Sequence, residues 1–163
     1  MISEAAIKAQ ASGRGDVAEY LSLKAANDLI RAAAIGWLLD SSTAIAEELN
    51  RQNAGIEIEN ENPHRFAVGN SNLVGSIFRV RQGVRCLSIE AGWTRTPTDG
   101  FMRGGALACG RISHFGMSRE NKELLLIRAD DSVNWFTLDK ENKRRAFDAR
   151  DIQRHFQIFL ATI

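Results

Sequence analysis

The hydrophobic period of this chain changes near residue 60, and no other feature constrains its fold as much. Before that point apolar residues recur at helical spacing, and after it they alternate in short runs broken by Gly, Asn and Asp. A final helical pattern closes the chain. In a chain of 163 residues this order predicts a single α+β domain, with N-terminal helices and one C-terminal helix packed on a curved, five- or six-stranded antiparallel meander.

Residues 1–55 form the expected helical part. A short Ala-rich helix is predicted over residues 3–11, and a stronger helix begins at Asp16, which has Glu19 at capping-box spacing. The apolar positions of the stronger helix wrap more than one face, which is typical of a central, covered helix. Polar side chains at 40–43 compete for backbone hydrogen bonds, so we expect a break or kink there, before a second segment that runs to about Gln52 and ends near Gly55.

Residues 64–139 form the expected sheet. Strands are predicted over 65–69, 73–81, 84–93, 106–115, 123–128 and 133–138, with turn residues at 70–72. Residues 56–63 hold either a short edge strand or the linker between the two halves.

The two-residue loop Gln82-Gly83 places Arg81 opposite Val84, and Phe78 opposite Leu87. In that register the two faces of the hairpin separate well. The apolar face holds Val74, Phe78, Val80, Leu87, Ile89, Ala91 and Trp93, and the other holds Ile77, Arg79, Arg81, Cys86, Ser88 and Glu90.

The last hairpin, 123–138, is apolar on both faces and needs cover on both sides. Either helices cover both faces, or a second subunit covers one of them. Together with two strongly apolar helices in a short chain, this pattern predicts a homodimer.

The C-terminal helix is expected within residues 146–163. Asp148 is its predicted N-cap, Phe147 and Ile152 stand at staple spacing, and Asp151 favours the first turn electrostatically. One apolar stripe then follows, formed by Ala149, Ile152, Phe156, Phe159, Leu160 and Ile163.

Composition and charge exclude several functions. The net charge of +1 predicts no bulk attraction to nucleic acid or to a membrane surface. No uninterrupted apolar run reaches the roughly 18 residues of a membrane span, and the N-terminus does not have the pattern of a signal peptide. A cytoplasmic protein is therefore expected. Its two cysteines, Cys86 and Cys109, are predicted to be free thiols in strands.

Catalytic signals are weak. The three histidines lack metal-ligand spacing, and no cofactor or metal is expected. His155 is predicted to be solvated. His114 is the one candidate for acid–base or nucleophilic chemistry, with Asp99, Cys109 or Ser113 as its partner. The Gly-rich residues 100–110 match no phosphate-binding motif, and we interpret them as a loop that runs into a bulged strand.

The clearest chemical feature is a basic segment over residues 79–119. It holds seven arginines against Glu90 and Asp99. Arginine binds carboxylate and phosphate groups through a planar fork, so the segment supplies candidate ligand-binding residues: Arg79, Arg81, Arg85, Arg103 and Arg111. The alternatives are an acidic protein surface, single-stranded nucleic acid if aromatic side chains stack beside the arginines, or arginines that are only solvated or at an interface.

Three functional hypotheses follow. The first is a non-catalytic interaction module that acts as a homodimer and binds a protein partner. The second is a binder of a small anionic ligand, with a pocket between the long helix and the sheet. The third is an enzyme that uses the 94–115 region.

Overall fold

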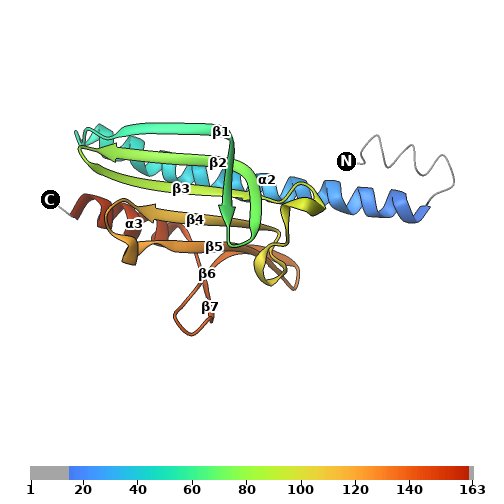
Figure 1. Cartoon of the computed structure of the whole chain (residues 1–163). Helices are drawn as coiled ribbons and strands as arrows, with labels where there is room; N and C mark the ends of the chain where they lie inside the picture. The colour runs from blue at the N-terminus through green and yellow to red at the C-terminus, as the bar shows by residue number, and fades with distance from the viewer. Residues whose placement is uncertain (1–14, 162–163) are drawn as a thin grey trace.

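The fold is α+β, as predicted, with seven strands in its sheet rather than five or six. The computed structural model describes residues 15–161, so the predicted helix over 3–11 and the stripe residue Ile163 lie outside it. All seven strands form one antiparallel sheet in chain order (Figure 1). The elements are α2 (Gly15–Arg51), β1 (Glu57–Val68), β2 (Ser71–Gln82), β3 (Arg85–Trp93), β4 (Ala108–His114), β5 (Lys122–Ala129), β6 (Ser132–Leu138), β7 (Arg144–Ala146) and α3 (Ala149–Ala161), with 3₁₀ turns at Pro97–Asp99, Arg103–Gly105 and Ser118–Glu120.

Strand boundaries differ from the prediction at both edges of the sheet. The two segments predicted at 56–63 and 65–69 form one long strand, β1, whose pairing register shifts between Glu61 and His64. The predicted turn at 70–72 is shorter, because Ser71 already pairs with Val68 and Asn72 with Ala67. The short strand β7, which carries two arginines and pairs with the end of β6, was not predicted.

The β2–β3 hairpin has the predicted faces but not the predicted pairing. Val80 pairs with Leu87, and Phe78 with Ile89, which shifts the register by two residues because the turn is Gly83-Val84. Side chains alternate with a period of two, so a shift of two leaves every residue on its own face. Of the predicted apolar face, all residues except Val74 belong to the core between the sheet and the helices.

A sharp bend divides the sheet. Gly75 on β2 pairs with Gly92 on β3. A Cβ atom on Gly75 would collide with the carbonyl oxygen of Ala91, and one on Gly92 would lie 2.6 Å from the carbonyl carbon of Val74. Glycine is required here because the two backbones approach so closely. Beyond this pair the end of the β1–β2 hairpin turns across the face of the sheet that lies away from the helices (Figure 1).

The bend gives the chain two apolar cores. The larger lies between the sheet and the helices and includes Phe78, Ile89 and Leu126. The smaller lies under the bent hairpin, where Leu73 packs with Leu125. The last hairpin, β5–β6, contributes to both cores, so each of its apolar faces is covered within a single chain.

α2 is one continuous helix, and the predicted break at 40–43 is wrong. Ser42 Oγ donates to the carbonyl of Leu38 at 2.7 Å, and Thr43 Oγ1 donates to that of Leu39 at 2.8 Å. Both hydroxyls are thus satisfied by carbonyls four residues earlier and do not compete for the helical amides. The helix ends at Arg51, close to the predicted end.

Only one side of α2 is covered, which differs from the central helix predicted. Ile35, Leu38 and Ala46 are buried against the sheet, while the N-terminal turns extend past the ends of β1–β3 (Figure 1). Residues Val17–Arg51 are also long and apolar enough to cross a membrane, a property that core helices of soluble proteins share. The helix contains no uninterrupted apolar run of that length, because isolated polar residues interrupt each run. Those residues do not make the helix polar on average.

α3 has the predicted start. The backbone amide of Asp148 donates to Asp151 Oδ2, and the amide of Arg150 donates to Asp148 Oδ1, both at 2.9 Å. Ile152, Phe156 and Phe159 are buried on the sheet, as the stripe predicts. Ala149 is exposed.

Truncating Phe156 should destabilise the fold strongly. Its ring is buried, 6.2 Å from the ring of Phe78 between centroids. We expect Phe156→Ala to lower the free energy of unfolding by about 3–5 kcal/mol, because a large cavity replaces the ring. Chemical denaturation measures this, with Gln157→Ala on the exposed side of α3 as the control. A loss below about 1 kcal/mol would mean that α3 does not dock as described.

Candidate functional site

The arginines predicted to bind a ligand are spread over the molecule, and each has a partner within the chain. Arg79 lies 3.5 Å from Glu61 and 3.9 Å from Glu59 on the neighbouring strand β1, and Arg81 lies 3.8 Å from Glu59. These partly exposed pairs neutralise the positive charge that the sequence segment carries. Exposed ion pairs of this kind contribute little stability.

The remaining three arginines point to other places. Arg85 Nη1 donates to the carbonyls of Phe159 and Leu160 at 3.2 and 3.4 Å, so it contacts the C-terminal end of α3. Arg103 pairs with Glu123 at 3.2 Å. Arg111 donates to Glu90. The five arginines therefore do not converge on a single anion site.

The three catalytic candidates are not brought together. Asp99 Oδ2 accepts from the backbone amides of Arg95 and Thr96 at 3.0 Å, which lowers the pKa of this carboxyl and uses it as a cap. Cys109 lies in the smaller core, where burial raises the pKa of its thiol to about 11 and leaves it a poor nucleophile. His114 is five residues further along β4 and faces the opposite side of the sheet.

His114 instead pairs with His155, which is buried rather than solvated. Its Nε2 lies 2.8 Å from Nδ1 of His155, and the rings stack with centroids 5.1 Å apart. Burial is the main cause that lowers the pKa of both rings, and for His155 the neighbouring His114 lowers it further, to about 4. The two histidines are therefore neutral, and their hydrogen bond links α3 to β4.

A second polar cluster surrounds Glu90, on the sheet face away from the helices. Glu90 Oε2 lies 2.7 Å from Nε2 of His64, and Oε1 accepts from Arg111 Nη2 at 2.7 Å and Nε at 3.0 Å. The ring of His64 stacks on Phe66, with centroids 5.4 Å apart. Glu90 thus links β1, β3 and β4 at the bend of the sheet. Glu90 and Arg111 are directly opposed in the β3–β4 register. A correct pairing of these two strands from the sequence would therefore have predicted the contact between Glu90 and Arg111.

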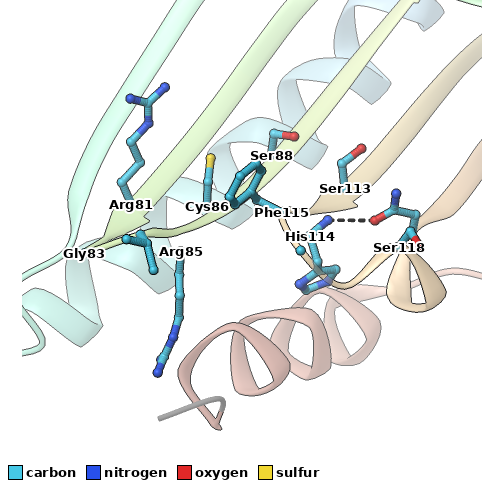
Figure 2. A pocket seen from close by; sticks show the side chains of 12 residues that line it. Arg81, Gly83, Arg85, Cys86, Ser88, Ser113, His114, Phe115 and Ser118 are labelled. Atoms are coloured by element: carbon cyan, nitrogen blue, oxygen red, sulfur yellow. Dashed lines mark hydrogen bonds between the residues drawn. The ribbon is translucent and has the colours of Figure 1, made fainter.

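An open hollow of about 790 Å³ lies at one end of this face. Arg81, Cys86, Ser88 and Ser113 line it, beside the exposed ring of Phe115. Arg81 and Arg85 leave the hairpin in opposite directions, and the ring of His114 points toward α3 rather than into the hollow (Figure 2). The hollow therefore offers neither convergent cations nor a base. Within residues 15–161 no group of three His, Cys, Asp or Glu side chains is placed to hold a metal ion.

The outward side of α2 leaves several apolar side chains uncovered. Leu23 is 56%, Leu29 60% and Trp37 40% exposed. We call residues Leu23, Ala26, Ile30, Ala33 and Trp37 the outward stripe; of these, Ile30 is half-buried and the other four are exposed.

Charged residues of the same turns lie on another side of α2. Between residues 20 and 39 they are Lys24, Asp28 and Arg31, which pair with one another. Arg31 Nε also donates to the carbonyl of Leu107, at 2.6 Å. These charges face the 94–107 loop, which leaves the outward stripe free of charge.

Beside the stripe is a hollow of about 560 Å³ between α2 and the start of α3. Ile30, Ala33 and Trp37 form one wall, and Trp135 and Phe147 belong to the other. Trp135 Nε1 donates to the carbonyl of Ala34 at 3.1 Å, which joins the two walls. The exposed stripe thus continues into an apolar groove.

Acid should destabilise the fold through the histidine pair. The pKa of each ring is lower in the folded chain than in the unfolded chain, so the unfolded chain binds more protons. The free energy of unfolding should reach its full value above about pH 6.5 and fall as the pH drops toward 4. At 1.36 kcal/mol per pKa unit, protonation of His155 should account for a loss on the order of 3 kcal/mol. Denaturation curves at a series of pH values measure this, and His155→Gln should flatten the profile in that window. An unchanged profile in the variant would show that other groups set it.

Removing the charge of Glu90 should cost more than removing that of an exposed glutamate. Glu90→Gln leaves Arg111 and His64 without their anion in a nearly buried position, so we expect a loss of about 2–3 kcal/mol in unfolding free energy. Glu123→Gln breaks the exposed pair with Arg103 and should cost less than about 1 kcal/mol. Equal losses in the two variants would contradict a linking role for Glu90.

Comparison with known proteins assigns this chain to no family. No protein-family model, no curated protein and no solved structure matches it. The function is therefore inferred from the contacts and surfaces described above.

Proposed function

We propose that this protein is a non-catalytic interaction module that acts as a homodimer, and that it binds through the outward side of α2. The observation that carries the proposal is the apolar outward side of this helix between Glu19 and Asp40, with Leu23, Leu29 and Trp37 exposed. Large contiguous apolar patches are uncommon on monomeric proteins and mark interaction sites.

The shape of the molecule supports the same proposal. The N-terminal turns of α2 extend past the sheet (Figure 1). Helices in water draw most of their stability from packing of an apolar face. A helix that extends from the domain with its apolar side exposed is best stabilised by a second apolar surface.

A protein surface is favoured over a lipid bilayer. For α2 to enter a membrane, Ile35, Leu38 and Ala46 would have to leave the core of the domain. Lys24, Asp28 and Arg31 would also have to leave water, at a high cost in free energy. An apolar protein partner covers the outward stripe without disturbing either group.

The two other hypotheses have less support. A small-anion site needs free, convergent cations, whereas Arg79, Arg81 and Arg111 pair with glutamates. An enzyme of the 94–115 region needs His114 near a carboxylate or thiol in a cleft, whereas His114 contacts His155.

Sedimentation equilibrium tests the proposal with a matched pair of variants. The wild type should have a mass of about twice 18.1 kDa at micromolar concentration. Ala33→Glu places a carboxylate in the middle of the stripe and should weaken self-association at least about tenfold, because burying an unpaired charge is costly. Ala32→Glu adds the same exposed charge one residue away, outside the stripe, and should leave the dimer intact.

Two results would contradict the proposal. One is a wild type that stays monomeric throughout the micromolar range. The other is a wild type that sediments with uncharged lipid vesicles while showing no self-association, which would assign the stripe to a membrane.

A further inference from the structure

The outward stripe of α2 has the spacing of a coiled-coil seam. Its residues, 23, 26, 30, 33 and 37, are separated by three, four, three and four positions, which is a heptad pattern with apolar a and d positions. The a positions hold the large side chains Leu23, Ile30 and Trp37, and the d positions hold Ala26 and Ala33. Large and small side chains therefore alternate along the seam.

This alternation fits one orientation of a second copy better than the other. In a parallel pair of helices, like positions meet, so alanine would face alanine and Trp37 would face Trp37. In an antiparallel pair, each a position meets a d position, so two of the three large side chains pack over an alanine, and the third faces a charged d residue at the end of the seam, Asp40 or Glu19. Facing large and small residues fill a helix interface without voids.

Gly36 favours one register of that antiparallel pair. A Cβ atom on Gly36 would meet nothing within 4 Å, so packing within the subunit does not require glycine there. Yet glycine inside a helix costs about 1 kcal/mol relative to alanine. When Trp37 packs over Ala26 of the partner subunit, Leu29 and Gly36 of the partner subunit flank the same side of the seam, about 3 Å apart along the helix axis. The missing side chain then makes room for Leu29, which is otherwise 60% exposed.

We infer that two copies of this chain pair through antiparallel α2 helices, around a two-fold axis that crosses them between residues 31 and 32. Trp37 then packs over Ala26 of the partner subunit, and Ile30 over Ala33 of the partner subunit. The interface is self-complementary, as a two-fold axis requires. This inference rests on the proposed homodimer and adds its orientation and register.

Cysteine cross-linking tests the register, in a Cys86→Ser background that removes the less buried native thiol. Copies with Ala26→Cys should form a disulfide with copies that carry Trp37→Cys when the two are mixed. Neither variant should cross-link with itself, because identical positions would be about 16 Å apart along the helix axis, too far for a disulfide. Sedimentation of each variant checks that it still self-associates.

Three results would overturn the inference. Cross-linking of Ala26→Cys with itself would indicate parallel helices. The absence of any cross-link, while the wild type and both variants remain dimeric, would place the interface or its register elsewhere and leave the proposed function standing. A monomeric wild type would remove both.

A second variant tests the role of Gly36 without cysteines. Gly36→Leu adds a side chain where the subunit has open space, so the fold should be retained. It should weaken self-association at least about tenfold by colliding with Leu29 of the partner subunit. Ala32→Leu is the control and should leave self-association unchanged. Equal affinities in the two variants would also overturn the register.

Discussion

Two glycines that face each other, Gly75 and Gly92, allow the close backbone contact on which the rest of the structure depends. Because neither has a side chain, the β1–β2 hairpin can turn sharply and lie across the sheet. The turn buries Leu73 against Leu125 and creates the smaller core. It also brings His64 within 2.7 Å of Glu90, so the polar cluster at the bend depends on the same two residues. A flat sheet would leave one apolar face of the β5–β6 hairpin in water.

Much of the fold could be predicted because its signals are local. The alternation of side chains with a period of two predicted the faces of the β2–β3 hairpin correctly. A register shifted by two residues leaves each residue on the same face, so the error in pairing did not affect this prediction. Asp148 and Asp151 marked the start of α3 through contacts within one helical turn. The seventh strand escaped prediction because the short segment Arg144–Ala146 is exposed and has no apolar alternation.

The polar clusters could not be predicted because their members are distant in sequence. His114 and His155 are 41 residues apart, and His64 and Glu90 are 26 apart. The density of arginine along residues 79–119 suggested an anion site, but charge along a sequence does not report charge in space. The glutamates of β1 lie outside that segment in the sequence and come beside Arg79 and Arg81 only after the strands pair. The expected break in α2 failed for a local reason, since Ser42 found its acceptor inside the helix.

The position of α2 at the start of the described chain has a consequence for biosynthesis. The helix leaves the ribosome before β2, β3 and β6, the strands that cover it. At 5–20 residues per second, the delay between completion of α2 and completion of β6 is on the order of ten seconds. During that interval the sheet-facing residues Ile35 and Leu38 are as exposed as the outward stripe. An apolar segment that stays uncovered while the rest of the chain is made is open to aggregation, so the route to the finished fold matters for this chain as well as the stability of that fold.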